Sequence, residues 1–262
     1  MQVGVSQLVY QGDTESFLRY AAETGYEVVE LALRAEGDLT LKTSDADLKR
    51  IRATADEVGV QLVSMPHSQC TGNLLASGDA QKTSIDQTRA GLEVAKKLGI
   101  GCTLHTLGRL NAELYYNAAY RNAVASLKTL ATDAERLGVT IAVEFVWNGF
   151  LFSPLEMKRF LDEIGSARIG FYFDPGNMAV FHFPHHWVRI VGKHTKMVHL
   201  KDWKGGPLNG GWPPLLQGAV DYAAMNRELR AIGYDGPMIS EVGEGDAPFA
   251  DTAAAIRKII AM

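Results

Sequence analysis

Four side chains that can bind a divalent metal ion follow short apolar runs in the second half of the chain. They are Glu144, Asp174, His199 and Glu241, at or near the ends of IAVEF, GFYFD, MVHLKD and PMISEV. If these runs are successive parallel strands, their carboxyl ends meet at one rim and the four side chains converge there. Carboxylates and one imidazole suit Mg²⁺, Mn²⁺, Co²⁺ or Zn²⁺, and a set without thiolates argues against a purely structural zinc site.

The two glutamates point to a reaction. Glu144 and Glu241 belong to well-separated runs, so a sugar held between them would have one carboxylate on each face. One carboxylate could remove a proton from a carbon next to a carbonyl and the other could return it, with the metal stabilising the enediolate oxygen. A single acid at a strand end is more often a helix cap or an ion-pair partner, and His199 alone could be a core histidine. Four such residues at successive strand ends favour a metal centre.

The elements that must position these residues follow a regular alternation. Apolar runs of strand character alternate with longer segments of helical period, which is typical of a parallel sheet joined by crossover helices. We expect strands at 3–9, 27–33, 61–67, 101–106, 140–146, 168–174, 196–202 and 237–243. We expect helices at 13–24, 46–58, 80–98, 111–137, 154–164, 184–193, 221–232 and 249–260.

Eight strand and helix pairs in 262 residues favour a (β/α)8 TIM barrel over a doubly wound open sheet. The open sheet would have a glycine-rich first turn, whereas this chain reads LVYQGDTE there. No domain boundary is visible, so residues 1–262 are predicted to form a single α/β domain. The longest irregular stretch, 201–219, falls after the seventh strand, where a catalytic loop belongs.

Bulk composition permits such an enzyme and argues against other classes. The chain is 47% hydrophobic and 21% charged, with a formal net charge of -4 and no basic cluster, which excludes a nucleic-acid footprint and a polybasic membrane segment. No basic leader and no apolar stretch of about 18 to 20 residues is present, so we expect a soluble cytoplasmic protein. Cys70 and Cys102 are too few for a disulfide framework and are expected to be reduced, with Cys102 in the core.

Several motifs resemble those of the xylose isomerase-like barrel superfamily of sugar isomerases and epimerases. They are VEF followed by WNG, DPGN at 174–177, HLKD at 199–202, and QGAVDYAAMNRELRAIGYDG leading into ISEV. The resemblance is strongest over residues 140–243 and is closest in pattern to ketose 3-epimerases and sugar-phosphate isomerases or epimerases. It implies that Glu144, Asp174, His199 and Glu241 bind one divalent ion, foremost Mn²⁺ or Mg²⁺, with Co²⁺ or Zn²⁺ as alternatives. It also implies that the two glutamates are the acid/base pair.

Two positions depart from the pattern of the ketose 3-epimerases related to tagatose epimerase. That group usually has a histidine where this chain has Asn177, and an arginine where it has Gln217. Both positions touch substrate in that group, so the identity of the sugar and its phosphorylation stay open. Asn177 could bind a sugar hydroxyl, or it could serve only the backbone of the DPGN turn. The same asparagine argues against the three-zinc site of the abasic-site endonucleases of the superfamily.

Further residues are predicted to line the substrate pocket. His67 and His105 end the third and fourth strands and would face the cavity, with loop packing as the alternative. Lys201 shares a strand face with His199 and is the best-placed cation for a keto oxygen, carboxylate or phosphate. Asp202 is expected to orient a ligand or the loop. Trp147 would form part of a hydrophobic wall or lid, or would simply pack.

Two other features have a structural explanation, which for one of them is an alternative to a functional one. Glu30, at the end of the second strand, is either a rim residue or a member of a buried ion pair. The histidines of FHFPHHWVRIVGKH include no i, i+4 pair with a flanking acid, and Pro184 marks a helix start instead. The exposed part of this segment is a candidate contact for a homodimer or homotetramer.

Three functions are compatible with these patterns. The first is a metal-dependent sugar isomerase or epimerase, acting on a ketose or keto sugar with or without a phosphate. The second is a metal-dependent dehydratase of a keto-cyclitol or a dehydroshikimate-like substrate. The third is a sugar-binding barrel without catalysis, which the full ligand set disfavours. A small sugar or sugar phosphate is the expected partner in each, with no nucleic acid and no membrane.

Overall fold

Eight parallel strands close into a barrel in the computed structural model, which describes residues 1–207 and 209–262. Around the barrel the order is β1-β10-β7-β6-β5-β4-β3-β2, so neighbours along the chain are neighbours in space. The strands are β1 (Val3–Ser6), β2 (Val28–Glu30), β3 (Gln61–Pro66), β4 (Cys102–His105), β5 (Thr140–Glu144), β6 (Ile169–Phe173), β7 (Thr195–Leu200) and β10 (Met238–Ser240). The predicted (β/α)8 architecture is confirmed.

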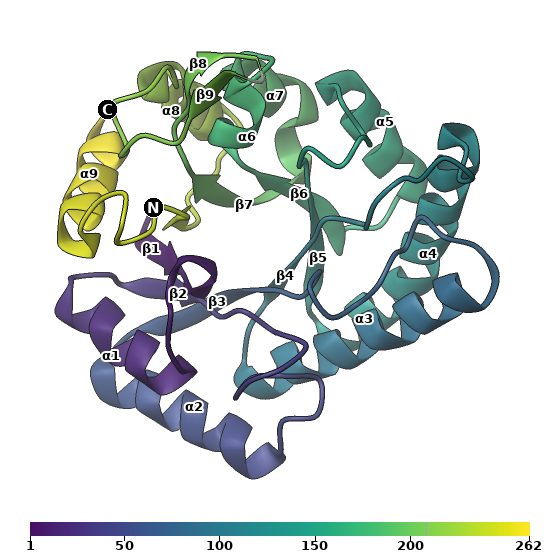
Figure 1. Cartoon of the computed structure of the whole chain (residues 1–262), viewed down its shortest axis with the longest axis horizontal. Coiled ribbons are helices and arrows are strands. Elements are labelled where there is room, and N and C mark those ends of the chain that lie inside the picture. The colour runs from purple at the N-terminus through teal and green to yellow at the C-terminus, as the bar shows by residue number, and fades with distance from the viewer. Residues whose placement is uncertain (208) are drawn as a thin grey trace.

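Helices form the outer layer, as Figure 1 shows for the ring around the strands. They are α1 (Thr14–Glu23), α2 (Asp45–Val58), α3 (Gly78–Leu98), α4 (Tyr116–Leu137), α5 (Pro154–Ile164), α7 (Pro184–Val191), α8 (Tyr222–Ala231) and α9 (Phe249–Ala261). Local sequence fixes their ends: the side chain of Ser44 caps the start of α2, and Gly99 and Gly138 stop α3 and α4 in the left-handed conformation. Pro184 begins α7, as predicted.

Strand side chains alternate between two cores. A large apolar layer lies between the strands and the helices. A second, smaller cluster fills the barrel itself and consists of Cys102, Leu104, Ala142, Tyr172, Met197 and Ile239. Cys102 is therefore a buried core residue, as expected, and both cysteines are free. This cluster fills the interior of the barrel. Residues that follow its members by two positions point to the same side of the strand and must therefore lie at the rim formed by the carboxyl ends of the strands.

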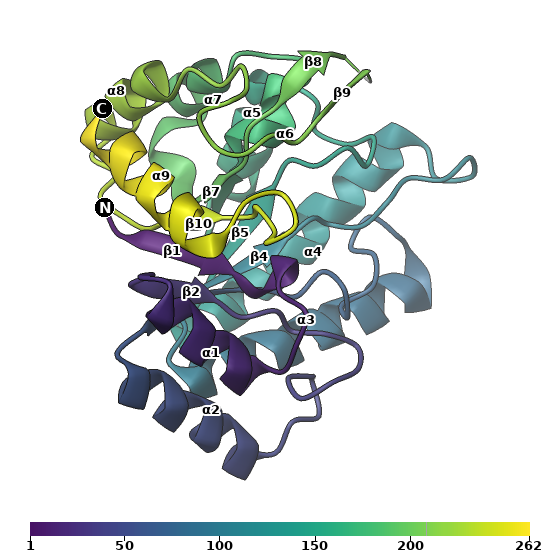
Figure 2. The same ribbon diagram turned by 60° about the vertical axis from the view of Figure 1, so that its left-hand side comes forward.

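Several boundaries differ from the predicted ones, mostly where strands meet loops. Residues Gln7–Val9 form a 3-10 turn instead of extending β1, and α4 begins at Tyr116 instead of residue 111. The segment after Asp174 forms a short helix, α6 (Pro175–Ala179). The long loop after β7 carries a small antiparallel hairpin, β8 (Lys204–Gly206) and β9 (Asn209–Gly211), which Figure 2 shows near α6 and α7. Among the described helices, none has the length and apolarity of a membrane span.

Candidate metal centre

Strand alternation brings the four predicted ligands to one place. Each follows a barrel-interior residue by two positions: Ala142, Tyr172, Met197 and Ile239 are followed by Glu144, Asp174, His199 and Glu241. Two residues along a strand restore the same face, so all four side chains point inward at the rim. One donor atom from each lies within 4.8 Å of the donors of the other three. The predicted convergence is confirmed.

The spacing of the donor atoms fits a single ion. His199 Nδ1 lies 3.4 Å from Glu144 Oε1 and 3.6 Å from Glu241 Oε1. Donors about 2.1 Å from a common ion are separated by roughly 3.0 to 4.2 Å in tetrahedral or octahedral coordination. These two separations fall in this range, and all four donors lie within 4.8 Å of one another, so these residues could hold a divalent metal ion.

Asp174 presents one oxygen to the site and uses the other for the backbone. Its Oδ1 accepts hydrogen bonds from Gly176 N at 2.8 Å and Asn177 N at 3.2 Å, which caps α6. Its Oδ2 is buried and lies 2.9 Å from the ammonium group of Lys201. No backbone N–H group of the described residues holds this oxygen, so it could also serve as a donor to a metal ion.

Lys201 supplies positive charge next to this set. Its Nζ lies 2.9 Å from Asp174 Oδ2 and 2.5 Å from Glu241 Oε2. Burial lowers the pKa of Lys201. The carboxylates of Asp174, Glu241 and Glu144 raise it by more than burial lowers it, so the net pKa lies well above its usual value. The ammonium group therefore offsets part of the negative charge of the three carboxylates. Its predicted role as a substrate-binding cation stays a prediction, since both of its contacts here are to ligand carboxylates.

The two glutamates have different electrostatic environments. Burial raises the pKa of Glu144 to about 7, against the opposing effect of His199. Burial also raises the pKa of Glu241, but His199 and Lys201 lower it more, and the net pKa lies below its usual value. Pairs of carboxyl groups whose pKa values are pushed apart are suited to acid and base roles. A bound divalent cation would add a lowering effect to both.

Glu30 lies behind His199 in the barrel interior. Its Oε1 lies 2.8 Å from His199 Nε2, and both residues are fully buried. The carboxylate also accepts hydrogen bonds from Ser6 Oγ, Ser64 Oγ and Tyr172 Oη. Of the two readings given for Glu30, the buried pair is correct. The sequence signal was an acidic residue ending the apolar strand VVE, but its partner lies 169 positions away.

Asn177 and Trp147 form one wall next to Glu144. Asn177 Nδ2 donates to Glu144 Oε1 at 3.2 Å and to Phe145 O at 3.1 Å. Trp147 Nε1 donates to Asn177 O at 3.0 Å. Asn177 therefore holds the carboxylate of a candidate ligand in addition to its place in the turn. That it and Trp147 touch substrate stays a prediction.

The expectation that His67 and His105 face the cavity is wrong. Both rings are fully buried and point outward from β3 and β4 toward α3. His105 Nε2 lies 3.3 Å from Thr88 Oγ1 of α3, and a Cβ on Gly91 of α3 would meet His67 Nδ1 at 2.5 Å. They stand an odd number of residues from the inward-facing Pro66 and Leu104, and alternation turns such side chains to the opposite face.

Asp202 orients the loop after β7. Its carboxylate accepts hydrogen bonds from the backbone N–H groups of Trp203 at 2.9 Å, Gly218 at 2.9 Å and Val220 at 3.1 Å. It thus joins the two ends of the segment that carries the β8–β9 hairpin. Gln217, at the second departure from the family pattern, is exposed and does not line the large cavity described below.

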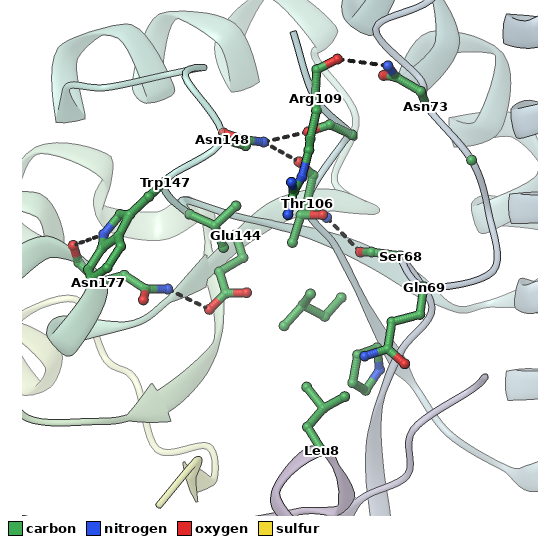
Figure 3. A pocket seen from close by; sticks show the side chains of 15 residues that line it. Leu8, Ser68, Gln69, Asn73, Thr106, Arg109, Glu144, Trp147, Asn148 and Asn177 are labelled. Carbon is green, nitrogen blue, oxygen red and sulfur yellow. Dashed lines mark hydrogen bonds between the residues drawn. The ribbon is translucent and has the colours of Figure 1, made fainter. Parts of the chain in front are cut away.

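A cavity of about 770 Å³ opens beside the metal centre (Figure 3). Glu144, Asn177 and Trp147 lie at one end, and the loops after β3 and β4 form the other. Trp147 lines the cavity and stacks on Trp212 with ring centroids 5.1 Å apart, so it both packs and borders the open space. Sequence reasoning missed the polar residues of the far end, which are Ser68, Gln69, Asn73, Thr106, Arg109 and Asn148. They lie in irregular loops, where no periodicity predicts which way a side chain points.

Both curated relatives of this chain are named as epimerases. The chain is 25% identical over 251 residues to 2-epi-5-epi-valiolone 7-phosphate 2-epimerase of an Actinoplanes species, covering 94% of this chain and 87% of that one. It is 25% identical over 203 residues to a probable L-ribulose-5-phosphate 3-epimerase of Mycoplasma pneumoniae, covering 73% and 66%. The crystal structure of a D-tagatose 3-epimerase-like protein superposes with a TM-score of 0.84 at 22% identity, covering 100% and 97%.

The family assignment follows from the sequence as a whole. The family described as xylose isomerase-like TIM barrel matches residues 18–260, which is nearly the full chain. The resemblance predicted from the VEF, DPGN and HLKD motifs is thereby confirmed. The chain belongs to the xylose isomerase-like TIM barrel family.

Proposed function

We propose that this protein is a metal-dependent isomerase or epimerase of a small sugar or sugar phosphate. The observation that carries the proposal is the convergence of two glutamates on Asp174 and His199: the buried Glu144 at the end of β5 and the largely buried Glu241 directly after β10. Strands β6 and β7 lie between them in the barrel, so their carboxylates approach the site from different sides. The names of both curated relatives, which are epimerases of phosphorylated substrates, agree with it.

The proposed mechanism assigns one proton transfer to each glutamate. A bound divalent ion would be held by Glu144, Asp174, His199 and Glu241 and would supply positive charge that acidifies the carbon next to a substrate carbonyl. One glutamate then accepts the proton from that carbon, and the other donates a proton to the opposite face. A carboxyl with a pKa near 7, as burial gives Glu144, can act in either direction near neutral pH. Water is kept from the site because the ligand residues are largely buried.

The nature of the ion is part of the proposal. Three carboxylates and one imidazole form an oxygen-rich set, which favours Mn²⁺ or Mg²⁺, with Co²⁺ and Zn²⁺ as weaker candidates. A cytoplasmic location agrees with the two free cysteines, because the cytoplasm keeps thiols reduced.

Isotope incorporation tests the reaction. Metal-stripped protein is incubated with each of the four ions and with free and phosphorylated ketoses in deuterated water, and the recovered sugars are analysed by NMR. Deuterium at C3 identifies a 3-epimerase, and deuterium at C1 identifies an aldose–ketose isomerase. An absorbance rise from a conjugated enone without label in recovered substrate would instead identify the dehydratase.

Two substitutions test the division of labour. Glu144→Gln and Glu241→Gln keep side-chain volume but cannot accept a proton, so each is expected to lower kcat at least 10³-fold at saturating metal. Circular dichroism should show an unchanged fold. Near wild-type turnover by either variant would overturn the two-glutamate mechanism.

A further inference from the structure

The end of the cavity far from the metal centre carries a single cationic group. Of the described residues that line the cavity, Glu144 and Arg109 are charged, and Arg109 follows β4. Figure 3 shows its side chain projecting into the space between Asn148 and Ser68. Its surroundings include the neutral polar side chains of Ser68, Gln69 and Thr106. This end of the cavity is therefore suited to an anion.

The backbone that carries Arg109 is fixed by side chains from two other loops. Asn148 Nδ2 donates to Thr106 O at 2.9 Å and to Gly108 O at 2.7 Å. Asn73 Nδ2 donates to Arg109 O at 2.8 Å. Arg109 thus stands on a preorganised loop although its side chain is exposed.

The turn before Arg109 also has a strained backbone. Leu107 is a non-glycine residue at φ 67°, a conformation that is unfavourable for L-residues. Gly108 follows at φ 113°, and a Cβ there would lie 2.2 Å from Asn73 Oδ1. Such strain persists only where the surrounding contacts determine the conformation, and here it turns the chain so that Arg109 reaches the cavity.

The guanidinium group of Arg109 has no partner among the described residues. Its side chain donates no hydrogen bond and makes no ion pair with them, whereas Arg50 and Arg89 each bind two carboxylates. Lys201, the other cation near the site, is already paired with Asp174 and Glu241. Five N–H donors in a planar fork match the oxygens of a phosphate group.

We propose that Arg109 binds the phosphate group of a phosphorylated substrate whose reacting carbons lie at Glu144. This inference rests on the proposed function and specifies its substrate class as a keto-sugar phosphate. Ser68 and Gln69 line the same cavity and bring no negative charge that would oppose an anion. Arg109 would then supply the cation that is missing at Gln217, on a different loop.

Paired substrates test the assignment. The values of kcat/KM are measured for D-ribulose 5-phosphate and D-ribulose, and for a second ketose pair, with wild type, Arg109→Ala and Arg109→Lys. We expect wild type to prefer the phosphorylated member. Arg109→Ala should lower kcat/KM for that member by about 10- to 100-fold, mainly through KM, and should lower kcat/KM for the free ketose far less. Arg109→Lys should lie between, because it keeps the charge but loses the planar fork.

A matched control and a binding measurement separate this inference from the proposed function. Arg227→Ala removes the same charge from the exposed face of α8 and should leave kcat/KM unchanged for both the phosphorylated and the free ketose. Titration calorimetry of manganese-loaded protein with glycerol 3-phosphate, and with glycerol as blank, measures phosphate binding without turnover. If Arg109→Ala affects both members of each pair equally, or binds glycerol 3-phosphate like wild type, the phosphate site is wrong and the epimerase proposal stands. If no ketose is turned over but binding depends on Arg109, the proposed function fails and the phosphate site stands.

Discussion

Glu30 Oε1 lies 2.8 Å from His199 Nε2, at the base of the metal centre. The carboxylate of Glu30 accepts the imidazole N–H, so the other ring nitrogen, Nδ1, is directed at Glu144 and Glu241. Three hydroxyl groups hold the Glu30 carboxylate in place. A carboxylate behind a metal-binding histidine fixes the ring orientation and tautomer and makes the histidine a better ligand. Glu30 is thus a positioning residue for His199.

Replacing Glu30 by glutamine should weaken metal binding without removing a ligand. The amide keeps the volume but loses the charge and presents a mixed donor and acceptor to the His199 N–H. We expect the dissociation constant for Mn²⁺ to rise about 10- to 100-fold. It can be measured by competition with a chelating dye, with folding checked by circular dichroism.

A control for this variant lies on the same segment. Glu27 is exposed three residues earlier, and Glu27→Gln makes the same chemical change away from the metal centre. It should leave the affinity for Mn²⁺ unaltered. Equal affinities of Glu30→Gln and wild type would contradict the positioning role.

Lys201→Met should destabilise the metal-stripped protein more than the metal-loaded protein. The substitution leaves the carboxylates of Asp174 and Glu241 without their ammonium partner, and loss of one member of a buried pair costs about 3 kcal/mol. A bound divalent ion would supply the missing positive charge. Urea denaturation in EDTA and in saturating Mn²⁺ measures the two free energies of unfolding.

The comparison needs a variant with the same change outside the centre. Lys204 is exposed on β8, so Lys204→Met should have little effect in either condition. If Lys201→Met lost the same stability with and without metal, Lys201 would not be acting as a counter-charge to the ligand carboxylates.

The barrel and the convergence of the four candidate ligands could be predicted because both depend on short-range regularities. Short apolar runs and helical segments ending in glycine specify the alternation, and a (β/α)8 topology then follows from chain order. The ligands required only that acids and a histidine end consecutive strands. The positions of Glu144 and Asp174 thus follow from the strands that precede them and do not require the loop conformations to be known.

The orientation of His67 and His105 was not predictable in the same way. Both faces of a barrel strand are buried, one toward the barrel interior and one toward the helices, so apolar residues occur on both and do not mark the inner face. Counting from an inward residue such as Leu104 gives the answer, but the structure was needed to identify Leu104 as inward. Arg109 and the Glu30–His199 pair depend on contacts between distant segments, which sequence spacing does not encode.

Trp147→Ala should raise KM more than it lowers kcat. The indole lines the cavity, stacks on Trp212 and donates its N–H to Asn177 O, so that donor is not directed at the predicted proton-transfer groups. Loss of this apolar wall should raise KM about tenfold. Trp147→Phe keeps an aromatic wall and loses one hydrogen bond, so a smaller change is expected. If kcat fell by several orders of magnitude at unchanged KM, Trp147 would be more than a wall.

Stability should decrease as the pH falls below about 6.5, and His105 should be responsible for part of the decrease. Burial lowers the pKa of His105 to about 4, whereas an unfolded histidine has a pKa near 6.5. Between these values the unfolded chain binds a proton that the folded protein does not, so stability is full above pH 6.5 and is lost toward pH 4. From pH 7 to pH 5 this group should reduce the free energy of unfolding by about 2 kcal/mol.

His105→Asn isolates this contribution from that of the metal ligands. The asparagine oxygen can accept the hydrogen bond from Leu107 N that His105 Nδ1 accepts, but it does not titrate. The variant will be less stable at pH 7, because it leaves space beside Thr88, yet its stability should decrease less between pH 7 and pH 5. Urea denaturation of both proteins in EDTA measures the difference between the two slopes. Parallel slopes would mean that the ring accepts a proton within the fold, and that burial against α3 does not exclude charge from this position.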